Sequence, residues 1–116
     1  MTLEEFGEKS PAEKRQWPRI DIKGHCFIDQ SEVMYKIRNI GPGGIRISSP
    51  TEFEAGEKFR LQVSLQDGYQ FESVGYVVWC LEQPENVKDN YEVGFKFVDL
   101  QTEDFKHIKK LIRLSF

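Results

Sequence analysis

Apolar and polar residues alternate over short stretches of this chain, and the alternation is strictest in KFRLQVSL, residues 58–65. Phe59, Leu61, Val63 and Leu65 take every second position, and polar residues take the others. Successive side chains of a β-strand point to opposite faces, so a period of two predicts a strand with one buried face. This pattern is the main constraint on the fold.

Five other stretches between residues 20 and 98 alternate in the same way. They are residues 20–28, 33–39, 44–48, 69–82 and 91–98. Asp67 and Gly68 predict a tight hairpin turn before residues 69–82, and Gly75 predicts a bulge or a close backbone approach within them. Six strands with turn signals and no helix between them predict an antiparallel sheet that is closed, or nearly closed, into a small barrel.

The C-terminal segment has a helical pattern instead. Thr102 can cap a helix, and acidic residues follow it in the first turn, where they complement the positive end of the helix dipole. An apolar stripe with helical spacing runs through Phe105, Ile108, Leu111 and Ile112. We expect this helix to close one mouth or one side of the barrel.

A bend precedes the first predicted strand. SPAEK, residues 10–14, has the signature of a helix N-terminus, and Pro18 would end such a helix by about residue 16. Arg15 therefore leaves a helical turn, whereas Arg19 enters an extended segment. Their side chains can converge on a group that lies across the bend.

The charge of the chain is uneven. Its net charge is −3, yet residues 14–23 contain Lys14, Lys23 and the two arginines against one aspartate, which gives this segment a charge of +3. Non-specific affinity for duplex DNA needs a broad cationic face, so this segment does not predict DNA binding. It suits a small anion, although a solvated surface strand would explain the charges as well.

Length and composition restrict the remaining possibilities. The 116 residues suffice for one domain, and no apolar run approaches the roughly 20 residues that span a bilayer. The acidic N-terminus lacks the apolar segment of a secretory signal, so we expect a cytoplasmic protein without membrane insertion. Isolated cysteines and histidines predict no metal site. Neither a nucleophile–base set nor a phosphate-binding loop is present, so we expect no enzymatic activity.

The second informative stretch is RNIGPGGIRI, residues 38–47, which we expect to be a loop between two strands. Asn39, Gly41 and Gly44 allow backbone conformations that other residues avoid. One interpretation is a hairpin turn that needs positive φ. The other is a nest of exposed N–H groups that receives a ligand between Arg38 and Arg46.

The two stretches together resemble the PilZ domain family of bacterial cyclic di-GMP receptors. The family has an R-x-x-x-R pair just before a small barrel and then a D/N-x-S-x-x-G motif. Arg15 and Arg19 match the pair, while Asn39 and Gly44 match the ends of the second motif. Gly41 stands where the family has serine. The C-terminal stretch of residues 91–112 is also similar to the strand, acidic turn and closing helix of the family.

The resemblance implies a six-stranded antiparallel PilZ-type β-barrel, residues 14–116, closed by the C-terminal α-helix and preceded by a flexible segment, residues 1–13. It also implies a cytoplasmic receptor that binds cyclic di-GMP, orders its N-terminal segment and signals to a protein effector of motility, pilus or exopolysaccharide machinery. No cofactor is expected. The ligand-binding residues would be Arg15, Arg19, Asn39, Gly41 and Gly44, with Lys14 and Trp79 beside them.

Two other interpretations stay open. Trp79 could form an apolar wall beside a guanine or be an ordinary tryptophan of the barrel. Gly41 lacks the family's hydroxyl, so the chain could be a protein–protein adaptor that binds no nucleotide. A barrel that binds oligonucleotides is disfavoured, because an acidic surface repels a long phosphate backbone.

Overall fold

The computed structural model describes residues 19–84 and 88–115. The helical turn predicted within residues 10–16, the flexible segment predicted for residues 1–13, and both Lys14 and Arg15 lie outside the described residues. The fold below therefore begins at Arg19.

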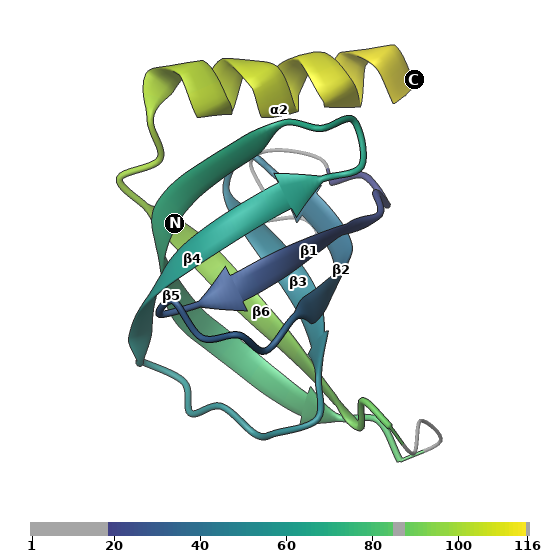
Figure 1. Cartoon of the computed structure of the whole chain (residues 1–116), viewed down its shortest axis with the longest axis vertical. Coiled ribbons are helices and arrows are strands. Elements are labelled where there is room, and N and C mark those ends of the chain that lie inside the picture. Colours follow the sequence, from purple (N-terminus) through teal and green to yellow (C-terminus); the bar gives the residue numbers. More distant parts are fainter. Residues whose placement is uncertain (1–18, 85–87, 116) are drawn as a thin grey trace, which may run out of the picture.

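The described residues form six antiparallel strands that close into a barrel in the order β1-β2-β3-β6-β5-β4 (Figure 1). This confirms the predicted fold class. The strands and the helix that follows them are β1 (Gly24–Ile28), β2 (Tyr35–Gly41), β3 (Gly44–Ser49), β4 (Lys58–Leu65), β5 (Gln70–Glu82), β6 (Tyr91–Val98) and α2 (Thr102–Ser115).

The first strand, β1, is shorter than the alternating stretch of residues 20–28 that predicted it. Ile20 forms an isolated bridge to Ile40, and its N–H and C=O each make a 3.0 Å hydrogen bond to that residue. The next residues leave β2, and the carbonyl of Lys23 accepts a hydrogen bond from the N–H of Gln66 at 2.9 Å. The ladder to β2 resumes only at His25. Residues 21–23 therefore lie apart from β2.

The connection within residues 38–47 is a hairpin turn, the first of the two interpretations above, but it is much shorter than the expected loop. β2 continues to Gly41 and β3 begins at Gly44, so a two-residue turn joins them. The strands continue because Ile40 and Ile45 are both fully buried and pair with each other close to the turn, although a bulge between Ile37 and Asn39 breaks the period of two in β2. The glycines with positive φ are Gly56 and Gly68, in other turns.

The barrel interior is filled by aliphatic and aromatic side chains from every strand. Phe53, from the segment between β3 and β4, meets Phe59 and Phe95 edge to face, with ring centroids 5.4 and 6.0 Å away. A Cβ on Gly75 would overlap the Leu61 side chain, so this glycine makes room for a core side chain and not for another segment of backbone. The bulge of β5 lies further on, after Val77.

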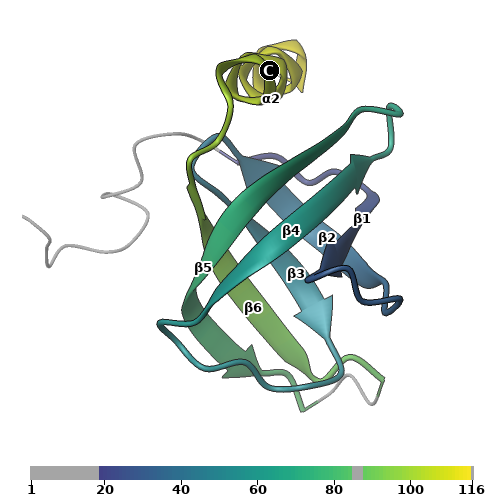
Figure 2. The same cartoon turned by 60° about the vertical axis from the view of Figure 1, so that its left-hand side comes forward.

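Helix α2 lies across one open end of the barrel, as predicted (Figure 2). Ile108 and Ile112 face the barrel and are buried. A polar clasp also ties α2 to the β4–β5 hairpin. It consists of Asp67, Tyr69, Asp104 and His107. No helix in the described part of the chain is long and apolar enough to cross a membrane.

The clasp combines stacking with two short hydrogen bonds. The Tyr69 and His107 rings are stacked, with centroids 3.8 Å apart and planes 8° from parallel. The Tyr69 hydroxyl donates to Asp104 Oδ1 at 2.7 Å, and His107 Nε2 lies 2.8 Å from Asp67 Oδ2. The hydrogen bond to Asp104 raises the pKa of Tyr69 to about 12. The backbone N–H of Tyr69 lowers the pKa of Asp67, and His107 lowers it further.

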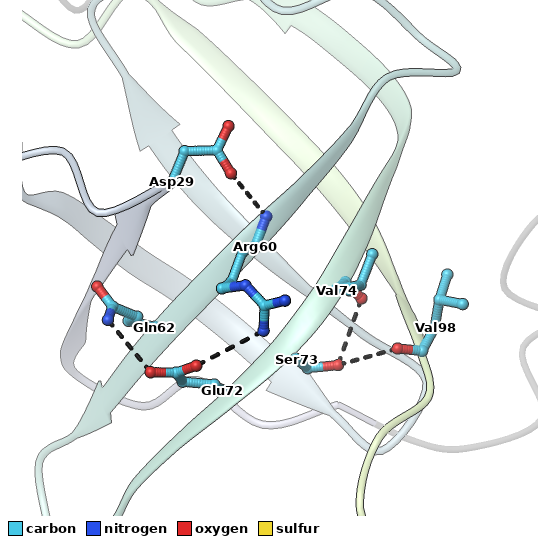
Figure 3. Close-up of polar contacts among 7 residues, drawn as sticks. All are labelled: Asp29, Arg60, Gln62, Glu72, Ser73, Val74 and Val98. Carbon is cyan, nitrogen blue, oxygen red and sulfur yellow. Dashed lines mark hydrogen bonds and ion pairs between the residues drawn. The ribbon is translucent and has the colours of Figure 1, made fainter.

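The outer face of β4 and β5 pairs its charges locally (Figure 3). Arg60 lies 3.7 Å from Glu72 across the two strands, and Gln62 donates to the same carboxylate at 3.2 Å. Asp29 accepts a hydrogen bond from the N–H of Arg60 at 2.9 Å. Beside them, the buried hydroxyl of Ser73 is 3.3 Å from the carbonyl oxygens of Val74 and Val98. Exposed pairs of this kind contribute little stability, so this face is an ordinary polar surface.

Candidate functional site

A row of side-chain positions crosses four strands on the outer face of the barrel. The strand register joins Asn39 of β2 to Arg46 of β3, Arg46 to Gly94 of β6, and Gly94 to Trp79 of β5. The neighbours of these residues along their strands include Ile45 and Val93, which are fully buried inside the barrel. Because side chains alternate along a strand, the row faces outward.

Arg19 reaches this row from the segment before β1. The bridge between Ile20 and Ile40 fixes the backbone next to it. Its Nη2 atom lies 3.4 Å from the position that a Cβ on Gly44 would occupy, and that Cβ would also overlap the carbonyl oxygen of Phe95. Glycine at position 44 therefore lets the two strands and the guanidinium group approach closely.

The side chain of Asn39 lies between two guanidinium groups. In the amide orientation that best satisfies its partners, its oxygen accepts hydrogen bonds from Arg46 Nε at 3.3 Å and Arg46 Nη2 at 3.0 Å. In the other orientation the oxygen accepts a longer bond, 3.5 Å, from Arg19 Nη1. We favour the first orientation because it gives two shorter, charge-assisted bonds. Asn39 is 8% exposed, so its amide is fixed within the wall of the site.

Glu92 of β6 is the acidic neighbour of this row. Its Oε2 atom lies 3.9 Å from Arg46 Nε and 3.7 Å from Arg38 Nε. One carboxylate is therefore shared by two arginines. The Glu92 side chain is 16% exposed and that of Arg46 is 34% exposed, so solvent screens this contact only in part.

Trp79 closes the other end of the row. A Cβ on Gly94 would overlap the indole ring, which therefore covers the backbone of Gly94. The register of β5 and β6 shifts between Val77 and Trp79, and the indole is half-buried on the outer face. Trp79 is thus a barrel-face residue beside the arginines and is absent from the core.

A second row lies next to the first one. Gly41 pairs with Gly44, Gly44 with Lys96, and Lys96 with Tyr76 of β5. Tyr76 is 37% exposed. The outer face therefore presents two aromatic side chains on β5, Tyr76 and Trp79, each in a row that also carries a cation.

The structure brings together several residues of the predicted site. Arg19, Asn39, Gly44 and Trp79 share one outer face, and Gly41 ends β2 opposite Gly44. Lys14 and Arg15 lie outside the described residues.

The sequence pattern missed Gly94, Lys96 and Tyr76. The available signal was the alternation of GFKF in β6, which marks Gly94 and Lys96 as outward, although it does not reveal their neighbours. Within residues 19–84 and 88–115, no group of three or more His, Cys, Asp or Glu side chains could hold a metal ion.

Solved structures of known proteins resemble the fold of this chain. The inhibitor of motility MotI/DgrA of Bacillus subtilis superposes with a TM-score of 0.75 and 22% sequence identity over 88% of this chain and 51% of its own. YcgR of Escherichia coli, in complex with c-di-GMP, superposes with a TM-score of 0.69 and 14% sequence identity, over 85% of this chain and 44% of its own. The isolated PilZ domain of YcgR with c-di-GMP superposes with a TM-score of 0.65 and 18% sequence identity, over 85% of this chain and 88% of its own. The chain thus spans about half the length of the first two proteins.

A comparison of this sequence with known protein families identifies the family of the chain. No curated protein matches this chain in sequence. Residues 13–114 match the sequence profile of the PilZ domain. That segment includes all six strands of the barrel and nearly all of α2. The chain therefore belongs to the PilZ domain family.

Proposed function

We propose that this domain binds cyclic di-GMP on the outer face of β2, β3, β6 and β5 and passes the binding event to a protein partner. The observation that carries the proposal is the Asn39 amide, which lies between the guanidinium groups of Arg19 and Arg46, with the Trp79 indole at the end of the same row. Two solved structures of similar fold, both of YcgR, contain c-di-GMP, which supports the choice of ligand.

The chemistry of the face suits a cyclic dinucleotide. Arginine can fork onto a phosphate, pair with the O6/N7 edge of guanine, or stack its plane on a base. Arg19 and Arg46 can serve these purposes from either side of Asn39. Stacking of a base on an exposed aromatic ring contributes about 1–3 kcal/mol in nucleic-acid complexes, and Trp79 offers such a ring.

Gly41 is the main departure from the family motif. A lost neutral hydrogen bond costs about 0.5–1.5 kcal/mol, which corresponds to roughly a three- to tenfold loss of affinity. A lost arginine that makes charge-assisted, bidentate bonds costs more. Because Arg15 and Arg19 are both retained, the proposed site keeps the stronger contacts and binds the nucleotide with reduced affinity.

The signalling step follows from the position of the basic segment. Residues 9–19 carry Lys14 and Arg15 beside Arg19, and these cations repel one another until an anion binds. Binding would order this segment against the barrel and give a protein effector a new surface to recognise. We place the receptor in a bacterial cytoplasm, and we propose an effector in motility, pilus or exopolysaccharide machinery. The similarity to a protein described as an inhibitor of motility supports the first of these.

One observation favours a second candidate function, an adaptor that binds no nucleotide. Glu92 already supplies a carboxylate to Arg46 and Arg38, and Gly41 lacks the family's hydroxyl. An internal anion of this kind could fill the role of the ligand in a constitutive adaptor. The receptor proposal is preferred because Arg19 and Asn39 keep the pattern of the family motifs.

Isothermal titration calorimetry of the full chain with cyclic di-GMP tests the proposal. We expect saturable heat at low micromolar protein and modest salt, and its loss in Arg15→Ala and in Arg19→Ala. Gly43→Ala is the control, because a Cβ at that turn position would meet no atom within 4 Å. If the unaltered chain showed neither heat nor NMR shifts, the adaptor function would replace the receptor function as the proposal.

A further inference from the structure

The barrel has a second basic region beside the site described above. β1 pairs with β2 at His25–Lys36 and at the next position only, and the strand contact returns at the bridge between Ile20 and Ile40. Between these two points, residues 21–23 lie apart from β2, tied to Gln66 instead. This separation opens a cleft in the outer surface.

Cations line the cleft from both of its sides. One recess of about 470 Å³ is bordered by Asp21, Lys23, Lys36, Arg38 and Arg46. A recess of about 600 Å³ adjoins it, shares both lysines and adds polar groups of β1 and β4. Both volumes fall within the range of small-molecule sites. When the one aspartate and the neighbouring Glu92 are set against the four cations, the cleft keeps a net charge of +2.

Lys23 and Lys36 account for the uncompensated charge. Glu92 lies beside Arg38 and Arg46, whereas neither lysine has an ion-pair partner within the part of the chain that the structure describes. His25 and Ser64, which line the larger recess, add polar hydrogen-bonding groups. Two lysines that border the same recesses suit a compact anion, since each ammonium group can donate three hydrogen bonds.

We propose that this cleft is a second anion site, which binds the phosphate group of a small phosphorylated ligand between Lys23 and Lys36. It is distinct from the row that contains Asn39 and Trp79, and it does not depend on cyclic di-GMP binding there. Arg46 borders both sites, so an anion in the cleft also changes the electrostatic potential at the first site.

Titration of the full ¹⁵N-labelled chain with inorganic pyrophosphate at low salt tests the proposal by NMR. We expect saturable shifts of the backbone N–H signals of Lys23, His25, Lys36 and Gln66. The variant K23Q/K36Q should bind pyrophosphate about tenfold more weakly or worse, because it loses both charged donors. The control K106Q/K110Q removes two exposed lysines of α2 and the same total charge, and it should bind as the unaltered chain does.

The outcomes separate the cleft from a general charge effect. Shifts that persist in K23Q/K36Q, or that weaken equally in K106Q/K110Q, would overturn the proposal. Non-saturable shifts would do so as well. A second titration, with cyclic di-GMP on the pyrophosphate-saturated chain, identifies the source of the phosphate. Displacement of pyrophosphate by the dinucleotide would show that cyclic di-GMP occupies the cleft, which would overturn the proposal of a distinct site. Retention of pyrophosphate would support a separate phosphorylated ligand. Failure of cyclic di-GMP to bind the Trp79 face leaves the pyrophosphate result unaffected.

Discussion

The indole of Trp79 covers the backbone of Gly94, at the place where any other residue would carry its Cβ. The two residues pair across β5 and β6, and Arg46 is the next residue of the row. Because position 94 of β6 is glycine, the aromatic ring can lie directly on the backbone at the outer face. The position of the proposed base platform depends on a residue that has no side chain.

Gly94→Ala should therefore displace the Trp79 ring and weaken cyclic di-GMP binding. The added Cβ cannot share space with the indole, so the ring must leave its present position. Loss of one stacked base predicts an affinity lower by about fivefold to a hundredfold, on the scale of about 1–3 kcal/mol per base. Tryptophan fluorescence and calorimetry measure the two effects.

Gly43→Ala is the matched control for that substitution. It adds the same methyl group to a glycine of the turn between β2 and β3, where no atom lies within 4 Å of the new Cβ. The control should keep both the fluorescence spectrum and the affinity. If Gly94→Ala shifted the tryptophan spectrum but bound cyclic di-GMP as tightly as the unaltered chain, Trp79 would not be part of the binding site.

Gly41→Ser tests the departure from the family motif. Gly41 is not among the glycines with positive φ, so a serine can adopt its backbone conformation without the strain of a left-handed residue. A restored hydroxyl should tighten cyclic di-GMP binding by up to about tenfold, the value of one neutral hydrogen bond. Calorimetry measures this gain. A marked loss of affinity in a variant that unfolds at the same temperature would show that the glycine serves the geometry of the turn.

The sequence predicted the barrel well because alternation is a local property. Leu61 and Val63 mark β4 by their spacing alone, and the two-residue turn after Gly41 still lies between two predicted strands. Where a strand ends depends on the neighbouring strand with which it forms hydrogen bonds, and a local pattern does not identify that neighbour. Residues 21–23 alternate like a strand, yet the hydrogen bond from Gln66 to Lys23 takes them away from β2.

The candidate site was harder to predict because it depends on register. Asn39 and Trp79 are 40 positions apart in sequence, and they share a row only through two intervening strands. The bulge after Val77 shifts the outward positions of β5 and brings Trp79 level with Gly94. No local pattern reveals such a shift. The same limit concealed Glu92 as the neighbour of two arginines.

Glu92→Gln should raise the affinity for cyclic di-GMP. The carboxylate lies 3.9 Å from Arg46 and competes with a phosphate for its guanidinium group. Surface ion pairs contribute about 0.2–1 kcal/mol, so the loss of this partly exposed pair predicts about a fivefold gain at most. The gain should shrink as salt rises, because screening already weakens the competing pair. Calorimetry at low and at physiological salt measures both effects.

Glu72→Gln controls for the change in net charge. Glu72 pairs with Arg60 at 3.7 Å on β4 and β5, away from the proposed site (Figure 3). This variant has the same charge as Glu92→Gln and should bind with nearly unaltered affinity. Equal gains in the two variants would mean that the total charge of the protein, and not the Arg46 contact, sets the affinity.

The clasp between α2 and the β4–β5 hairpin predicts a dependence of stability on pH. The pKa of Asp67 is lowered in the folded protein, so its contribution is present above the ordinary aspartate pKa of about 3.9 and is lost as the pH falls through the folded value. The pKa of Tyr69 is raised to about 12, so its contribution is complete below the unfolded pKa of about 10 and disappears as the pH rises toward 12. Denaturant unfolding across pH 3–11.5 tests both limits.

Tyr69→Phe separates the hydroxyl from the ring in this clasp. The variant keeps the ring that stacks on His107 but leaves the buried Asp104 without its 2.7 Å hydrogen bond. The free energy of unfolding at pH 7 should fall by about 0.5–1.5 kcal/mol, and the alkaline loss of stability between pH 10 and 12 should diminish. Tyr76→Phe removes a hydroxyl that has no hydrogen-bond partner within residues 19–84 and 88–115, and should leave stability unchanged. If the two variants unfolded alike at every pH, the Tyr69 hydroxyl would have no part in holding α2 on the barrel.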